Sequence, residues 1–199
     1  YAPEQAQTRL HTITIQVGRT GTLTPVAELE PVFVDGSTIS RATLHNEEEI
    51  GRKDIRIGDT VIIEKRGDVI PGVISVVKDL RPAGAEPFDM IAATGSQCPE
   101  CGGAIHKDEE FVAWRCINTD CPAQAAQRLE HFAARTALDI DCLGDIVSDK
   151  LVERQLASSP LDLFDLTVEQ LGPLNLGTDD EPRMFGEKNA TKLVASVER

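Results

Sequence analysis

The sequence predicts a multidomain α+β protein, with an N-terminal β-barrel, a small four-cysteine zinc module and a C-terminal helical region. Three observations predict it: polar and apolar residues alternate near the N-terminus, four cysteines form two close pairs, and apolar residues take helical spacing after Pro122. A chain of 199 residues can hold two or three small domains. We place the barrel at 1–82, a linker at 83–97, the zinc finger at 98–122 and the helices at 123–199.

The first ninety residues have the pattern of short strands separated by turns. Apolar and polar residues alternate from His11 to Val17, and Leu23 to Val34 is a second extended stretch. Pro25 and Pro31 interrupt that stretch, which indicates an edge strand or a bulge. Two more apolar runs, at 61–63 and 69–77, each come after a turn signal that contains glycine and aspartate.

One helix is expected among these strands, in the glutamate-rich segment from Leu44 to Ile55. Several strands with one short helix between the middle ones favour a closed barrel of the OB type. A generic SH3-like barrel is the alternative. We interpret Asp59 as a turn residue, not as a metal ligand.

The cysteine pairs are Cys98-x2-Cys101 and Cys116-x4-Cys121, with fourteen residues between them. Two close pairs on a hairpin-sized spacer are typical of a tetrahedral four-cysteine zinc site. Four thiolates leave no open coordination position, so the zinc would be structural. A pair of disulfides, or unrelated buried thiols, is the alternative. We expect His106 on the surface and Cys142 outside the site.

The C-terminal region is expected to be helical. Pro122 opens a helix that runs to Ala137, with an apolar stripe of Ala126, Leu129, Phe132 and Ala133. Two hairpins come next, each with a glycine directly before a helix, and the two helices are expected at 145–155 and 187–199. This is the form of a helix-hairpin-helix unit, whose glycine lets backbone N–H groups approach a phosphate. A helical bundle that binds no ligand is the alternative.

The net charge of −13 does not favour nucleic-acid binding, which depends on neutralising phosphates. There are 14 acidic and 10 basic residues before Cys98, and 19 acidic and 10 basic residues from Cys98 onward. Binding would therefore depend on a few basic side chains at particular positions. The alternative is that these side chains are only solvated surface charges. No segment is apolar for long enough to span a bilayer and no signal peptide is evident, so we expect a protein of the reducing intracellular compartment.

Four segments resemble the OB-fold domain of bacterial NAD-dependent DNA ligases. They are Val17–Ala27, Ala42–Asn46, Asp54–Asp59 and Gly67–Pro71. The order of the cysteines, the Pro-Ala-Gln directly after them and the two hairpins resemble the zinc and helix-hairpin-helix parts of the same enzymes. The resemblance extends over nearly the whole chain.

The resemblance implies the sealing of nicks in duplex DNA during replication and repair. The enzyme is adenylated by NAD, AMP passes to the 5′-phosphate, and the 3′-hydroxyl attacks. The family's nucleophilic lysine lies in a Lys-x-Asp-Gly motif, which is absent from this chain. Tyr1–Glu4 resembles the segment directly after the last lysine motif of the adenylation domain. We therefore expect the DNA-gripping portion of the enzyme, without catalytic residues and inactive alone in self-adenylation.

The resemblance also implies cofactors and partners. Structural Zn2+ is expected in this chain, whereas NAD and Mg2+ would bind mainly outside it. The expected partners are nicked double-stranded DNA and the adenylation domain. We expect a monomer in the bacterial cytoplasm, at the nucleoid.

The implied DNA contacts position the protein on the duplex without reading its bases. Arginine donates two hydrogen bonds to a phosphate, whereas threonine and asparagine each donate one. An equally good interpretation of Asn46 is a cap on the helix that begins after it. The candidate contacts are Arg19, Thr20, Thr43, His45, Asn46, Lys53, Arg66, Gly144, Gly186 and Lys188.

Two features depart from the family pattern. Cys142 stands where a glycine is usual, and residues 178–183 form an acidic insertion. Two other functions fit the composition. One is a single-strand-binding protein with an OB fold and a zinc ribbon, although only Tyr1, Phe33 and Phe88 could stack bases in the barrel region. The other is a zinc-stabilised scaffold for protein interactions.

Overall fold

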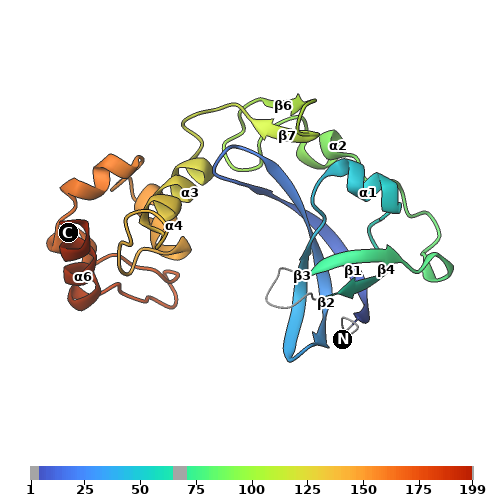
Figure 1. The fold of residues 1–199 in the computed structure, drawn as a ribbon, viewed down its shortest axis with the longest axis horizontal. Coiled ribbons are helices and arrows are strands. Elements are labelled where there is room, and N and C mark those ends of the chain that lie inside the picture. The colour runs from blue at the N-terminus through green and yellow to red at the C-terminus, as the bar shows by residue number, and fades with distance from the viewer. Residues whose placement is uncertain (1–4, 65–70, 199) are drawn as a thin grey trace. The chain divides into compact units, whose positions relative to one another are not determined.

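The computed structural model describes residues 5–64 and 71–198, and these divide into two compact units (Figure 1). The first unit holds the residues up to Val17 and Gly21–Ile117, and the second holds Gly18–Thr20 and the chain from Asn118 onward. The elements of the first unit are β1 Gln5–Val17, β2 Leu23–Val34, β3 Ser37–Thr43, α1 Glu47–Lys53, β4 Thr60–Glu64, β5 Gly72–Val76, the 3-10 helix η1 Lys78–Leu80, α2 Met90–Thr94, β6 Ile105–Asp108 and β7 Ala113–Cys116. Those of the second are α3 Pro122–Ala133, α4 Asp145–Glu153, the 3-10 helix η2 Pro160–Asp165, α5 Val168–Leu171 and α6 Glu187–Val197.

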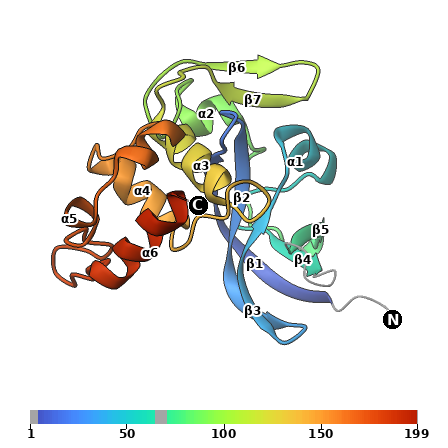
Figure 2. The same cartoon turned by 60° about the vertical axis from the view of Figure 1, so that its left-hand side comes forward.

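The first five strands form a closed barrel in the order β1-β2-β3-β5-β4, with β4 returning to β1 (Figures 1 and 2). Strand β1 is long enough to pair with two neighbours. Its first half, Gln5–Arg9, pairs with β4, and the half from Leu10 to Val17 pairs with β2. The β1–β2 ladder shifts register between Leu10 and Thr12, near the point where β1 changes partner. A closed five-stranded barrel with α1 between β3 and β4 confirms the OB type over the SH3-like alternative.

Strand β2 runs from Leu23 to Val34 as expected, and the interruption predicted at Pro31 is present, whereas Pro25 pairs in register with Ile15. The pairing of β2 with β3 shifts register between Glu28 and Val32, a stretch that contains Pro31. Pro31 has no backbone N–H to donate to a neighbouring strand. A bulge at this position therefore costs no hydrogen bond that Pro31 could have donated. The barrel core is aliphatic and includes Leu10, Ala27, Leu44, Val61 and Ile63.

Helix α1 lies within the segment expected to be helical. The Asn46 side chain caps it by accepting a hydrogen bond from Glu49 N at 2.8 Å. Asp59 is fully buried and its carboxylate accepts from Arg56 N, which confirms a turn residue.

The segment expected as a linker, 83–97, carries structure. Asp89 caps the short helix α2, and Met90 at its start is 1% exposed. Phe88 packs against the barrel core. The segment is therefore part of the first unit, and the expected boundary at residue 82 does not separate two cores.

The second unit has its own core, built where α3, α4, α6 and the intervening turns meet. The predicted stripe of α3 lies in it or at its edge, since Ala126, Leu129 and Ala133 are buried while Phe132 packs edge-on to Phe164. The helices end two to four residues earlier than expected. Across the described ranges, no helix is both long and apolar enough to cross a membrane.

Candidate zinc centre and nucleic-acid interface

The sulfur atoms of Cys98, Cys101, Cys116 and Cys121 all lie within 4.8 Å of one another. Cys98, Cys116 and Cys121 are buried, and none of the four is in a disulfide. Four sulfurs at zinc–sulfur distances of about 2.3 Å would lie a little under 4 Å apart. The cluster therefore fits a tetrahedral zinc ion, and the predicted ligand set comes together.

Backbone geometry explains how the first pair turns around this point. Gly102 has φ +68°, which favours glycine, and its N–H donates to Cys98 O at 2.9 Å. Gly103 N lies 3.4 Å from Cys101 Sγ, so a backbone N–H faces the thiolate. His106 is exposed on β6, as expected of a surface residue.

The second pair is shaped by a turn and by the start of a helix. Asn118 forms the turn, in which Cys121 N donates to Asn118 O at 3.2 Å and Asp120 N donates to the Asn118 side chain. Cys121 directly precedes α3, whose first residue is Pro122. The longer x4 spacing thus accommodates one extra turn before the helix.

Two of the turns predicted to contact DNA lie at the same end of the barrel. The β1–β2 ladder ends at the Val17–Leu23 pair, so residues 18–22 form its turn. Strand β3 runs antiparallel to β2 with Thr43 opposite Val26, and Leu44 N donates to Pro25 O at 3.0 Å. The chain after Thr43 therefore proceeds toward the end of β2 that carries the first turn.

The polar side chains of these turns differ in exposure and in whether they form hydrogen bonds within the protein. Arg19 is exposed, and its guanidinium makes no hydrogen bond or ion pair with any group of residues 5–64 and 71–198. Thr20 is exposed as well. The Thr43 hydroxyl accepts from His45 N at 3.1 Å, and His45 is exposed with φ +64°. Asn46 caps α1, so the local role foreseen for it is real.

The basic side chains of α1 are engaged by other groups of the protein. Lys53 is only 17% exposed, and its ammonium group lies 2.8 Å from Glu49 and donates to Val73 O at 2.6 Å. Arg52 forms two hydrogen bonds with the same carboxylate. Hydrogen bonds from Arg52 and Lys53 lower the pKa of Glu49 to about 2. These contacts favour a structural role for Lys53, and Arg66 lies outside the described residues.

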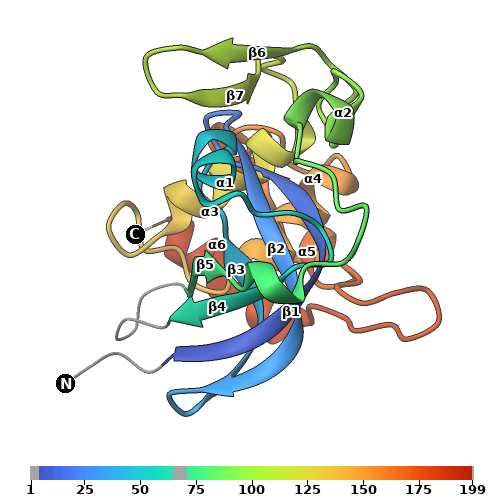
Figure 3. The same cartoon turned by 90° about the vertical axis from the view of Figure 1, so that its right-hand side faces the viewer.

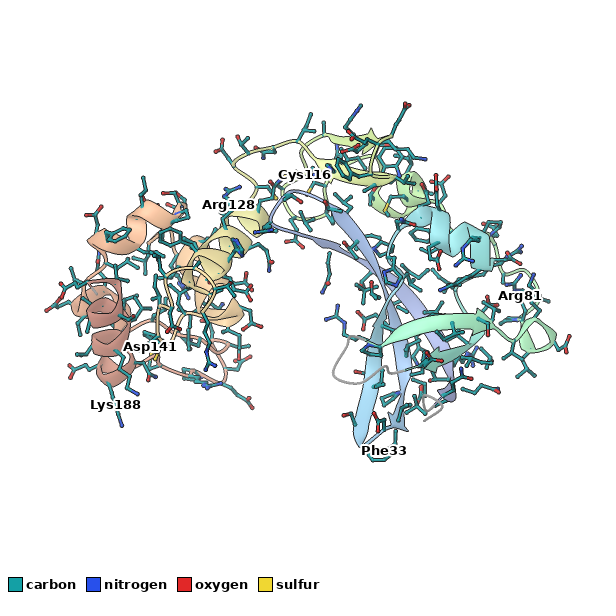
Figure 4. All side chains as sticks on the ribbon, viewed as in Figure 1. Phe33, Arg81, Cys116, Arg128, Asp141 and Lys188 are labelled. Carbon is teal, nitrogen blue, oxygen red and sulfur yellow. The ribbon has the colours of Figure 1, made fainter. Side chains whose placement is uncertain are left out.

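Both predicted hairpin glycines are helix N-caps. Gly144 precedes α4 and Gly186, with φ +84°, precedes α6. A side-chain carbon built at either glycine would meet no atom within 4 Å, so the space on the Cβ side of both glycines is open. Lys188 is exposed in the first turn of α6 (Figure 4). Within the second unit, Arg19 and Gly144 line one depression of about 360 Å3, together with Glu130 and His131.

The two departures from the family pattern have clear positions. Cys142 is exposed and has φ +65°, a left-handed conformation that explains why a glycine is usual there. The insertion at 178–183 forms the tip of the second hairpin, beyond the hydrogen bonds of Leu176 N to Arg183 O and Phe185 N to Leu174 O. The acidic residues are therefore carried away from Gly186 along the hairpin.

One contact of this region has no counterpart among the sequence-based predictions. The Glu47 carboxylate accepts from Trp114 Nε1 at 3.0 Å and from Met90 N at 2.7 Å. Glu47 and Trp114 are 67 residues apart, and no local pattern relates them. Only the fact that Trp114 is the single tryptophan of the chain singles it out.

Comparison with known proteins agrees with both parts of this geometry. Residues 7–85 match the family model of the NAD-dependent DNA ligase OB-fold domain, and residues 97–123 match that of the NAD-dependent DNA ligase C4 zinc finger domain. Together the two matches cover more than half of the chain.

Whole-length similarity extends through the helical region too. The chain is 54% identical over 198 residues to a protein named DNA ligase from Akkermansia muciniphila. It is 49% identical to those named DNA ligase from Desulfosudis oleivorans, over 199 residues, and Methylococcus capsulatus, over 200 residues. These alignments cover all of this chain and 25%, 27% and 28% of the respective relatives, so the chain spans about a quarter of their length. The chain belongs to the family of NAD-dependent DNA ligases and carries its OB-fold and C4 zinc-finger domains.

Proposed function

We propose that this chain is the DNA-gripping part of an NAD-dependent DNA ligase that seals nicks in duplex DNA. The observation that carries the proposal is the position of two turns, residues 18–22 and 43–46, at the same end of the OB barrel. Contacts from two adjacent turns can track one stretch of phosphate backbone without reading its bases.

The residues of these turns suit that task. Arg19 offers a fork of N–H donors that matches phosphate geometry, and Thr20 in the first turn and His45 in the second turn are both exposed. The chain has a net charge of −13, so long-range attraction cannot supply the affinity. A small number of short-range contacts would then decide binding.

The hairpins would add contacts at a second place on the duplex. A helix N-terminus presents free backbone N–H groups and the positive end of the helix dipole to an anion. The open space on the Cβ side of Gly144 and Gly186 is compatible with such an approach. Lys188, one residue into α6, would strengthen it.

The remaining chemistry belongs to other parts of a complete enzyme. We propose that NAD and Mg2+ act mainly on an adenylation domain, while zinc on the four cysteines holds structure here. The chain contains no Lys-x-Asp-Gly string, so it offers no nucleophilic lysine of the family type. Incubation with NAD and Mg2+ should leave its mass unchanged, and a covalent AMP adduct would contradict this assignment.

Single-strand binding is less well supported. Phe33 is 67% exposed but lies next to the β2–β3 turn, at the far end of β2 from residues 18–22. Phe88 is partly buried and packs against the barrel core. A row of stacking aromatics, which single-strand binders use, is not formed by Phe33 and Phe88.

The test is a binding comparison on three DNAs of equal length at fixed salt: nicked duplex, intact duplex and single strand. We expect the nicked duplex to bind most tightly. Equal affinity for the two duplexes would remove the nick from the proposal. Preference for the single strand, or no binding to any of them, would overturn it.

A further inference from the structure

Strand β7 of the zinc module is attached to both turns proposed to contact DNA. Cys116 N donates to Gly21 O at 2.8 Å, and Arg115 forms an antiparallel bridge with Thr22. Two residues before Cys116, the Trp114 indole donates to Glu47. Figures 1 and 3 both show β7 beside the β1–β2 turn and close to α1. One four-residue strand thus contacts the end of each turn.

The two residues that β7 holds, Gly21 and Glu47, lie outside the hydrogen-bonded strand pairs of the barrel. The last β1–β2 pair is Val17–Leu23, and β3 ends at Thr43. Gly21 and Glu47 lie on the far sides of these ends. The barrel therefore fixes where each turn starts, and β7 holds Gly21 within the first turn and Glu47 directly after the second.

Glu47 is well suited to hold the second turn. It is the first residue of α1 and comes directly after Asn46, which caps the helix. One carboxylate oxygen accepts from Trp114 Nε1 and the other from Met90 N at the start of α2. A carboxylate can accept hydrogen bonds at both oxygens. A side chain with fewer acceptor oxygens at position 47 would leave Trp114 Nε1 or Met90 N with a weaker acceptor.

We infer that Trp114 is a positioning residue, which fixes the turn at residues 43–46 relative to the turn at 18–22 through its hydrogen bond with Glu47. A zinc ion on the four cysteines would contribute by holding Cys116, and with it the register of β7. The inference rests on the proposed function only in assigning DNA to these turns. The link between Trp114 and Glu47 can be tested without DNA.

The experiment uses the whole chain loaded with zinc, with Trp114→Phe, Glu47→Gln and the double variant. Phenylalanine keeps an aromatic ring but has no N–H. Glutamine keeps the shape of Glu47 but has one acceptor oxygen and an NH2 group that would face a donor. Phe111→Leu is the control, because Phe111 is exposed on the same hairpin and contacts Arg115, not Glu47.

Hydrogen exchange at the amides of residues 43–50 is the first readout. We expect both single variants to raise exchange there on the order of fivefold, the effect of losing one hydrogen bond. Trp114→Phe should raise exchange less in the Glu47→Gln background than in the unmodified chain, because Glu47→Gln already weakens the bond that Trp114→Phe removes. Additive effects, or no effect of Trp114→Phe, would overturn the link.

Affinity for nicked duplex DNA is the second readout. Trp114→Phe should weaken it roughly threefold to tenfold with no change in its dependence on salt, since no charge is removed. Faster exchange with unchanged affinity would overturn the positioning role while leaving the contact in place. If the unmodified chain binds no nicked DNA, the proposed function fails, and the exchange experiment still decides the link between Trp114 and Glu47.

Discussion

The Arg81 guanidinium holds the carboxylate of Asp59 through two hydrogen bonds, Nε to Oδ1 and Nη2 to Oδ2, each 2.9 Å long. Asp59 is 0% exposed, and its Oδ2 also accepts from Arg56 N at 2.8 Å. Arg81, labelled in Figure 4, also donates to Asp54 at 2.8 Å. The segment after β5 is thereby fastened to the turn before β4.

This network predicts how the barrel responds to acid. Hydrogen bonds from Arg81 and Arg56 hold the pKa of Asp54 well below its usual range. A carboxyl group whose pKa is lower in the folded state stabilises the fold above about pH 4, and the contribution is lost as pH falls toward the folded-state pKa. Arg81→Gln should therefore reduce the pH dependence of the free energy of unfolding below about pH 4.

The same variant should also destabilise the barrel at pH 7 by about 3 kcal/mol, because it leaves the buried Asp59 carboxylate without its charged partner. Urea unfolding followed by circular dichroism at pH 7 and pH 3 measures both effects. Lys78→Gln is the control, because Lys78 also pairs with Asp54, at 3.4 Å, but its side chain is exposed. We expect this variant to change the free energy of unfolding by less than about 0.5 kcal/mol. Equal losses in the two variants would contradict the role given to Arg81.

Cys142 predicts a stabilising substitution. Its φ of +65° is a left-handed conformation that costs a side-chain-bearing residue about 1–2 kcal/mol, and glycine avoids that cost. Because glycine also raises the entropy of the unfolded chain, we expect Cys142→Gly to gain about 0.5–1 kcal/mol in urea unfolding. Cys142→Ala keeps the Cβ and should not gain; a similar gain in both would attribute the effect to loss of the thiol.

Sequence patterns predict the elements whose signal is local. The two glycine hairpins, the proline-interrupted β2 and the cysteine pairs depend on residue types with a strong conformational preference or a fixed spacing. Strand β3 is not predicted, because only Ile39 and Ala42 are buried in a polar segment, at no two-residue period. The first half of β1 is missed for a related reason, since its inward residues include the polar Thr8.

The rest of the site cannot be predicted from sequence because it depends on long-range pairing. Arg81 stands at the edge of an expected linker, yet its partners are more than twenty residues earlier in the chain. Lys53 has neighbouring bases and is expected as a DNA contact, whereas Glu49 and Val73 occupy its ammonium group. The charge of a residue is visible in a sequence, but the partners that neutralise it are fixed only by the fold.

The cysteine cluster predicts one zinc ion per chain, with Cys142 unliganded. Cys121→Ser should lower zinc content to well below one per chain and raise hydrogen exchange across residues 97–121, because metal binding and folding of such a site are coupled. Exchange in the barrel core around Leu10 and Ile63 should change little. Cys142→Ser is the matched control and should keep a full zinc content. Elemental analysis and exchange mass spectrometry measure both, and zinc loss in the control would show that the ligand set is wrong.

We expect Arg19 to supply one of the few phosphate contacts by which this acidic chain binds DNA. If its guanidinium contacts one phosphate, Arg19→Ala should weaken binding to nicked duplex and reduce the slope of log affinity against log salt by about one. Sequence preference should not change, because a phosphate contact carries no base information. Fluorescence anisotropy across a range of salt concentrations measures the slope.

The matched control for this experiment is Arg9→Ala. Arg9 is exposed in the half of β1 that pairs with β4, eight residues before the strand reaches the turn. Removing it changes net charge by the same amount as Arg19→Ala, so any general electrostatic effect is equal in the two variants. We expect Arg9→Ala to leave the salt slope nearly unchanged. Equal changes in affinity and slope would mean that overall charge governs binding, and the assignment of DNA contact to the β1–β2 turn would then be wrong.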